Sequence, residues 1–463
     1  MVAEVKIWNP IEVAEEARKD YASQILASHL TIDPSLSFPL MKPLIIKLCK
    51  DIFKAWSNLD DSCFHVEKIS GGITNLLLKV SVKEENCIDD TIAIRLYGPN
   101  TEYIIDRHRE LQAVKYLSAA GFGAKWLGIF GNGMVQSFIN AHTLIPSDIR
   151  DPKLAAKVAK ELRRFHHVDI PGSKEPQLWN DIWKFFEKAS VLEFEESKMH
   201  KTYKTISFRE VHDEIVELKY WAILRTRWSL RRFSYYHRTT LRVNIDLLLV
   251  YIGLGYVSWA NHTRHDKDVN HRIQTGWMKR RNVSGGICDK RLSSILPQGL
   301  SDRLNSPVIF SHNDLLSANI MINDEDKIYF IDYEYASYNY RGFDIANHFA
   351  EYAGFECDYN LYPNMNEQFH FFRHYIQPDR PHEKEFIKAE VSEKDLETFY
   401  VETNTYVLAS HLFWALWGLI QAKMSAIDFD YLGYFFLRYN EYKRQKEKCF
   451  LQAQSYLSGF KTE

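Results

Sequence analysis

Short apolar runs separated by turn residues are the first clear pattern along the chain. They are rich in β-branched residues, which favours strands of an antiparallel sheet. The runs are Phe64–Ser70, Leu76–Val82, Thr91–Tyr97, Trp126–Phe130 and Met134–Ile139. Gly131-Asn132-Gly133 separates the last two and is a hairpin signal. A helix is expected over Leu44–Leu59, and a second over Glu102–Ala120, which ends before Gly121 as a helix with a glycine cap does. These elements predict a small sheet with few helices.

After about Ala141 the apolar spacing becomes helical. Asp151-Pro152 is a good N-cap and first-turn pair, and Leu154, Val158, Leu162 and Phe165 share one face of the helix that follows. Thr405–Ala426 is a second strong helix, apolar on most of its circumference. Val308–Ser311 and Ile328–Ile331 are short strand-like runs, each leading into acids and amides. The pattern predicts an α+β protein whose larger part is mainly α, with its chemistry after these two strands.

Composition is that of a globular protein, but its charge is unevenly spread. The chain has 463 residues, of which 46% are hydrophobic and 25% charged, and this excludes disorder, collagen and a coiled-coil rod. A net charge of −2 argues against a dedicated nucleic-acid binder. Tyr220–Arg291 nevertheless holds 14 Lys and Arg, four Asp and no Glu, a net charge of +10. The rest of the chain is therefore clearly acidic.

The cysteines and the apolar stretches indicate the cytoplasm. Six Cys without a CxxC pair or zinc-type spacing favour a reducing compartment and no structural metal. The amino terminus lacks the apolar run of a secretory signal. Leu247–Tyr256, the most apolar stretch, is shorter than the roughly 20 residues that span a bilayer. We expect no stable membrane insertion and no nucleic-acid partner.

Two polar clusters have the spacing of a phosphoryl-transfer site. His312 to Asn319 has the form H-x-D-x-x-x-x-N, in which the Asp orients the attacking hydroxyl and the Asn binds a metal ion. Asp332 lies thirteen residues beyond Asn319 at the end of a strand, where a carboxylate can bridge Mg²⁺ to phosphates. An isolated Asp after a strand is more often a turn or cap residue. The two clusters together favour a kinase-type site with Asp314, Asn319 and Asp332.

Upstream residues are candidates for nucleotide binding. The turn between the first two predicted strands contains Ser70, Gly71, Gly72, Thr74 and Asn75, whose backbone amides could cover phosphates, although a plain hairpin turn explains the glycines equally well. Arg95 in a strand and Glu110 on the following helix are similar in placement to the strand cation and helix acid of protein kinases. Surface charges are common at such places, so these candidates depend on the downstream pair.

His312 to Asn319 and Ile331 to Glu351 closely resemble the choline/ethanolamine kinase family, over about Phe64–Lys219 and Leu300–Tyr442. Within the family, Asn-Asp-Leu-Leu in the catalytic loop resembles the plant-type ethanolamine kinases. The resemblance implies a two-lobed protein-kinase-like fold, with a small antiparallel β N-lobe and a larger mainly α C-lobe. It also implies ATP and Mg²⁺ as cofactors and phosphorylation of ethanolamine, the first step of phosphatidylethanolamine synthesis by the CDP-ethanolamine route. Asp314 would be the base, Asn319 and Asp332 metal ligands, and Glu334 a neighbour at the metal.

The resemblance also assigns residues around the amino alcohol. These acceptor residues are Tyr335, Glu351, Trp414, Trp417, Phe429 and Tyr434. A carboxylate and aromatic faces suit a small cation, but core packing explains a tryptophan pair in such an apolar helix equally well. A choline kinase or a dual choline/ethanolamine kinase is the nearest alternative function. A catalytically weak isoform with a basic binding arm is an alternative of another class.

Two departures from the family pattern stand out. Ala318 occupies a position where family members usually have Gly or another residue, and it would be strained if the backbone there had a positive φ. The basic stretch at about 220–295 has no counterpart in the family pattern, and three interpretations are open: a surface insertion, a functional basic arm, or non-coding sequence carried into the protein. The expected domains are an N-terminal extension (1–60), a nucleotide-binding lobe (61–141) and a catalytic lobe (142–463) that this stretch interrupts. A homodimer is one expected assembly.

Overall fold

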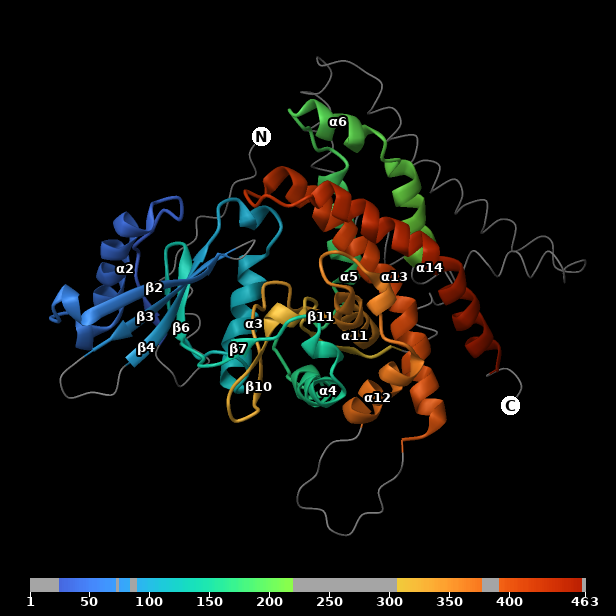
Figure 1. Cartoon of the computed structure of the whole chain (residues 1–463), viewed down its shortest axis with the longest axis horizontal. Helices are drawn as coiled ribbons and strands as arrows, with labels where there is room; N and C mark the ends of the chain where they lie inside the picture. The colour runs from blue at the N-terminus through green and yellow to red at the C-terminus, as the bar shows by residue number, and fades with distance from the viewer. Residues whose placement is uncertain (1–24, 72–74, 84–89, 220–305, 377–390, 460–463) are drawn as a thin grey trace, which may run out of the picture. The chain divides into compact units, whose positions relative to one another are not determined.

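The computed structural model describes residues 25–71, 75–83, 90–219, 306–376 and 391–459 (Figure 1). The chain divides into two units, and the larger one comprises residues 1–206 and 306–463. In the other, Ser207–Asn305, residues 208–219 are helical, and the predicted insertion at about 220–295 lies outside the described residues. No helix among the described residues is both long and apolar enough to cross a bilayer. The fold and the site below belong to the larger unit.

A six-stranded sheet, in the order β1-β5-β6-β4-β3-β2, forms the first part of this unit. Its strands are β1 (Leu26–Ala27), β2 (Phe64–Gly71), β3 (Asn75–Val82), β4 (Asp90–Tyr97), β5 (Trp126–Phe130) and β6 (Gly133–Ser137). All five predicted strands are confirmed to within two residues at each end. The antiparallel prediction needs one correction, because the unpredicted β1 pairs with β5 in parallel.

Helix α2 (Phe38–Ile52) packs on one face of this sheet. Met41, Ile45 and Leu48 are buried on it, in one core with the strand residues Leu78 and Ile94. The predicted bounds were wrong at both ends, because Pro39 fits the first helical turn and the chain becomes extended at Phe53. The other predicted helix of this region is also shorter than expected. Asp106 caps α3 (Arg107–Ala119), and a separate 3₁₀ turn, η3 (Thr101–Tyr103), precedes it.

The second part of the unit is mainly helical. Its helices are α4 (Pro152–His166), α5 (Leu178–Ala189), α6 (Ser197–Lys204), α11 (Arg341–Ala350), α12 (Met365–Ile376), α13 (Glu393–Met424) and α14 (Tyr431–Gly459). The predicted cap of α4 is confirmed, since Asp151 accepts from the amides of Lys153 and Leu154. Helix α13 begins twelve residues before the predicted Thr405, at a cap formed by Ser392. It packs along α14, and α11 and α5 also contact it.

Short strands carry the polar clusters among these helices. They are β7 (His142–Thr143), β8 (Val308–Ser311), β9 (Ile320–Ile322), β10 (Ile328–Phe330) and β11 (Ser337–Tyr340). Antiparallel pairing of β8 with β11, and of β9 with β10, brings the two predicted clusters together. Phe165 of α4 lies beneath them, with its ring 5.9 Å from that of Phe310 and 6.0 Å from that of Phe330. The functional segments therefore rest on a rigid aromatic core.

Candidate active site

The loop after β8, residues 312–319, holds Asp314 in a defined orientation. The side-chain amide of Asn319 donates to the Asp314 carbonyl at 2.8 Å and to its Oδ2 at 3.1 Å. Among the described residues, Oδ1 of Asp314 has no hydrogen-bond partner. Burial, and then the charges of Asp332 and Glu351, raise the pKa of Asp314 well above its ordinary value. One carboxylate oxygen is therefore fixed, and the other is available to accept a proton.

His312 and Ile331 join this loop to the segment that bears Asp332. The backbone N–H of Ile331 donates to the Asn319 carbonyl at 3.0 Å, and Nε2 of His312 donates to the Ile331 carbonyl at 2.9 Å. Nδ1 of His312 accepts from the Asp314 amide at 3.3 Å. Burial lowers the pKa of His312, which keeps the ring neutral and suits these two roles. Asn319 and Asp332 are thereby held as neighbours.

Asn313 and Asp332 both have a φ of 65°, in the left-handed region. Asn and Asp tolerate this conformation better than other residues with a side chain. Asp344 of α11 holds the first of the two positions, since its Oδ1 accepts from the Asn313 amide at 2.6 Å and its Oδ2 from the His312 amide at 2.9 Å. Asp344 lies in the family motif Ile331 to Glu351, but the sequence pattern predicts no role for it. The structure identifies it as a positioning residue.

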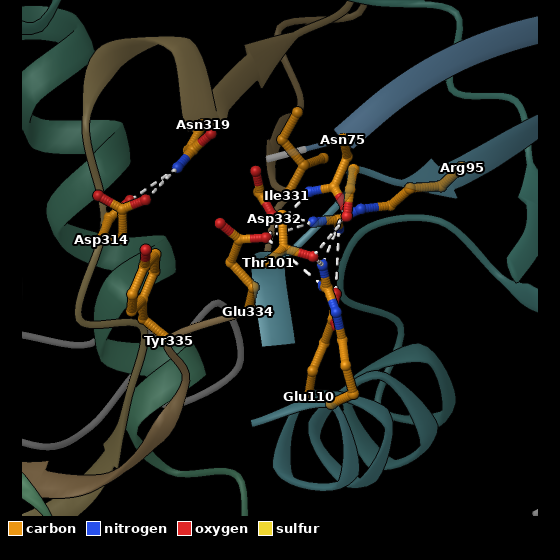
Figure 2. A network of polar contacts seen from close by, with 12 residues as sticks. Asn75, Arg95, Thr101, Glu110, Asp314, Asn319, Ile331, Asp332, Glu334 and Tyr335 are labelled. Carbon is orange, nitrogen blue, oxygen red and sulfur yellow. Dashed lines mark hydrogen bonds and ion pairs between the residues drawn. The ribbon is translucent and has the colours of Figure 1, made fainter. Parts of the chain in front are cut away.

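Arg95 is at the centre of a charged cluster that joins the sheet to the catalytic segment. Its guanidinium lies 3.4 Å from Glu110 and 3.0 Å from Glu334, and also contacts Asp332. Figure 2 shows these side chains converging from β4, α3 and the segment after β10. The predicted pairing of a strand cation with a helix acid is therefore present, although the cation also contacts Asp332 and Glu334. Burial, and then the charge of Asp332, raise the pKa of Glu334 to about 8.

Arg107 is a second cation of this cluster that the sequence did not reveal. It donates to Glu110 at 2.7 Å and lies 3.7 Å from Glu334, with its guanidinium over the ring of Tyr97. Asn75, a predicted nucleotide residue, donates from its amide to Glu334 at 2.9 Å. The only local signal for Arg107 is its place directly after the cap residue Asp106. Its partners lie on other elements, which a sequence pattern does not connect.

The donor set fits the magnesium site that the resemblance implies. Two cations, Arg95 and Arg107, face three carboxyl groups, Glu110, Asp332 and Glu334, and a further bound cation would favour the ionised form of Glu334 in spite of its raised pKa. Oδ1 of Asn319 and Oδ2 of Asp332 have no hydrogen-bond partner among the described residues. Hard oxygen donors of this kind are those that Mg²⁺ prefers, usually with only one or two protein ligands. No cluster of three or more His, Cys, Asp or Glu suited to a metal occurs in the described part of the chain.

Most of the acceptor residues assemble into one aromatic cluster. The ring of Trp414 lies 5.3 Å from Tyr335 and 5.4 Å from Trp417, and Trp417 lies 6.2 Å from Tyr434. The Trp417 indole N–H donates to the Tyr335 hydroxyl at 2.8 Å. Phe429 is more exposed, at 38%, and its ring lies 6.0 Å from Tyr434. Figure 2 shows the side chain of Tyr335 pointing toward Asp314. Burial, and then the charges of Glu334 and Asp314, raise the pKa of Tyr335 well above its ordinary value.

Glu351 has a strong partner that the sequence did not indicate. Arg438 of α14 donates to its Oε1 at 3.1 Å, and both side chains are buried. Oε2 of Glu351 has no hydrogen-bond partner among the described residues. Burial raises the pKa of Glu351 and Arg438 lowers it, with burial the larger effect. One oxygen is thus fixed by an arginine while the other is available.

Several sequence expectations need comment. The concern about Ala318 was wrong, because Ala318 is exposed in a 3₁₀ turn and is absent from the residues with positive φ. Ser70 and Gly71 end β2, as expected of residues beside the turn. Gly72 and Thr74 lie outside the described residues.

A family comparison agrees with this site. The model of the choline/ethanolamine kinase family matches residues 66–244 and 289–443. The unmatched stretch, 245–288, falls inside the predicted insertion but is shorter than it, since the match includes residues 220–244.

Individual relatives agree as well. The chain is 52% identical to a probable ethanolamine kinase of Arabidopsis thaliana, over 99% of this chain and 100% of the relative. It is 31% identical to probable ethanolamine kinase A of Dictyostelium discoideum, over 85% and 88% of the two chains. The solved ethanolamine kinase of Plasmodium vivax has a TM-score of 0.63 and 26% identity, covering 96% of this chain and 95% of that one. With a sheet part, a helical part and the two polar loops as described, the chain belongs to the choline/ethanolamine kinase family.

Proposed function

We propose that the protein phosphorylates ethanolamine with ATP, giving phosphoethanolamine, the first step of phosphatidylethanolamine synthesis by the CDP-ethanolamine route. The observation that carries the proposal is the position of Asp314. Its Oδ1 has no hydrogen-bond partner among the described residues, and the carboxylate is close enough to Asp332, Glu351 and Glu334 for their charges to raise its pKa. Relatives across plants, amoebae and animals named ethanolamine kinases support the same substrate.

In this mechanism Asp314 accepts the proton of the substrate hydroxyl through Oδ1. Asn319 keeps the carboxylate in place, and the raised pKa of Asp314 favours proton uptake. Asn319 and Asp332, with Glu334 close by, would hold Mg²⁺, which when bound neutralises charge on the transferring phosphoryl group. Arg95 and Arg107 hold the carboxylates of the metal site in position, and Arg95 provides positive charge for phosphates. The turn of Ser70, Gly71, Gly72, Thr74 and Asn75 remains our proposal for phosphate contact.

The acceptor residues match the chemistry of a primary ammonium. Aromatic faces attract any small cation, by about 0.5–2 kcal/mol per contact. Three N–H donors additionally need acceptors, and the free Oε2 of Glu351 is one. A trimethylammonium group has no such donors and would use the rings alone. The carboxylate therefore favours ethanolamine, and the ring cluster keeps choline as the competing substrate.

Initial rates with ethanolamine and with choline test this proposal. We expect a higher kcat/KM for ethanolamine, activity that disappears with a chelator and returns with Mg²⁺, and ATP as phosphoryl donor. Equal or better use of choline would overturn the ethanolamine assignment. A lack of phosphoryl transfer to either alcohol would overturn the enzyme assignment itself.

We also propose a cytoplasmic location and keep the homodimer as a proposal. The described cysteines, Cys49, Cys63, Cys357 and Cys449, are all free, which supports a reducing compartment. Fluorescence microscopy of the tagged protein tests the location. Size-exclusion chromatography with light scattering tests the assembly.

A further inference from the structure

A continuous chain of hydrogen bonds connects the catalytic loop to Glu351. It begins at the Asn313 carbonyl, which accepts from the side-chain amide of Asn347 at 3.0 Å. Oδ1 of Asn347 accepts from the Ser410 hydroxyl at 2.8 Å and from the Trp414 indole at 2.6 Å. All of these groups are buried, so they do not exchange their bonds with bulk water. Asn347 thus joins the residue before the base to one wall of the aromatic cluster.

Arg438 completes this chain from helix α14. One guanidinium nitrogen, Nη1, donates to Oε1 of Glu351 at 3.1 Å. The other, Nη2, donates to the hydroxyl of Ser410 at 2.9 Å and to its carbonyl at 3.3 Å. The side chain of Arg438 is only 1% exposed. Three elements, α13, α14 and the 3₁₀ turn η6 (Glu351–Ala353), therefore meet at this guanidinium, and Ser410 extends the chain to Asn347 of α11.

A guanidinium is suited to this position for two reasons. Its planar fork fixes two partners at a set angle, which a flexible lysine ammonium does not do. Its charge is permanent, so it favours the ionised form of Glu351 and opposes burial, which raises the pKa of this carboxyl group. Because Nη1 occupies only Oε1, the remaining oxygen of Glu351 is oriented and still available.

We propose that Arg438 is a positioning residue for the amino-alcohol acceptor: it fixes Glu351 as an oriented carboxylate and, through Ser410 and Asn347, ties that carboxylate to the loop that bears Asp314. The ammonium and the hydroxyl of one small substrate would then be held in a fixed relation, the first by Glu351 and the second by Asp314. This inference rests on the proposed function, since it concerns the same acceptor site.

Steady-state kinetics of substituted proteins test the role of Arg438. We expect Arg438→Gln to raise the KM for ethanolamine about tenfold or more, equivalent to about 1.4 kcal/mol, with the KM for ATP unchanged. Arg438→Lys should recover part of this loss, because it keeps the charge but not the fork. Arg444→Gln is the matched control, because Arg444 lies on the same helix, its side chain is 67% exposed and it pairs with Glu441 instead of Glu351; its KM for ethanolamine should equal that of the wild type.

The pair of Glu351→Gln and Arg438→Gln distinguishes positioning from a purely structural role. If Arg438 acts through Glu351, the double variant should bind ethanolamine no worse than Glu351→Gln alone. Removing both charges also avoids an unpaired buried carboxylate, so this variant remains informative if Arg438→Gln does not fold. Additive effects, an equal rise in the KM for ATP, or an unchanged KM for ethanolamine in Arg438→Gln and Arg438→Lys would overturn the proposal. Wild-type protein that does not phosphorylate ethanolamine would instead overturn the proposed function.

Discussion

Asp344 is the residue for which the structure allows the most detailed prediction. Its carboxylate accepts three hydrogen bonds, from the amides of His312 and Asn313 and from Nε2 of His166 at 2.8 Å. The carboxylate can only accept, so Nε2 of His166 bears the proton and Nδ1 accepts from the Tyr375 hydroxyl at 2.7 Å. Asp344 is fully buried, and these bonds, with His166 first among them, outweigh burial and lower its pKa.

Asp344→Asn replaces one carboxylate oxygen by an amide group that can only donate. At least one of the three N–H groups then faces another donor, and the remaining hydrogen bonds are made to a neutral oxygen instead of a charged one. One lost bond to a charged group is worth about 1.5–3 kcal/mol, and the unsatisfied N–H and the two weakened bonds add to this. We therefore expect the free energy of unfolding to fall by about 3–5 kcal/mol.

The same substitution should lower activity, because it loosens the left-handed turn at Asn313 directly before the base. A small displacement of a reacting group costs up to about a hundredfold in rate, so we expect kcat to fall at least about tenfold. Urea unfolding followed by circular dichroism measures the first effect, and initial rates with saturating ethanolamine and ATP measure the second.

Asp326→Asn is the matched control for this substitution. Asp326 is an exposed, ion-paired aspartate that also has a positive φ, and its pair with Lys157 is worth about 0–1 kcal/mol. If Asp344→Asn were as stable and active as the control, the positioning role of Asp344 would be refuted.

Three further substitutions test other parts of the site. Asp314→Ala should reduce kcat by about 10²–10⁴ with no loss of stability, because burial penalises this carboxylate; near-normal rates would mean that another group is the base. Burial lowers the pKa of His348 from 6.5 to about 4, so folding loses about 3 kcal/mol as the pH falls from 6.5 to 4. His348→Gln should remove this contribution, so the free energy of unfolding should fall less between pH 7 and pH 4.5 in the variant than in the wild type. An equal fall in both proteins would contradict the prediction. A Cβ at Gly133 would overlap the Arg95 carbonyl and the Phe130 ring, so Gly133→Ala should cost about 1–3 kcal/mol and raise the KM for ATP; wild-type values would show that β4 adapts freely.

Local patterns predicted those parts of the fold whose determinants are close in sequence. The strands were found because alternating apolar residues and turn residues are properties of a few neighbouring positions. Helix starts were less accurate. Residues 393–404 of α13 are more polar than the predicted Thr405–Ala426, so periodicity did not reach the cap at Ser392. Glu102 was included in a helix that begins only after Asp106.

The site was predictable where a motif carries it and not where distant side chains meet. Asp314, Asn319 and Asp332 stand in two short motifs, and the structure brings them together. Arg95 meets Asp332 across 237 positions, and Arg438 meets Glu351 across 87. No periodicity or spacing rule encodes contacts of that range, so Arg107 and Arg438 become visible only when the elements that carry them are packed.

The left-handed backbone at Asn313 and Asp332 restricts which amino acids the chain can accept there. At Asn313 the backbone admits Asn, Asp or Gly at low cost, while its side chain donates to Tyr335 and Ser337 and accepts from Asn339. Only Asn satisfies both demands. Position 332 requires a residue that tolerates the left-handed backbone and carries a negative charge opposite Arg95. Only Asp meets both requirements, because Glu keeps the charge but suits this backbone poorly. A saturation library at either position should therefore return a single functional residue, and these two positions are poor choices for redesigning the enzyme.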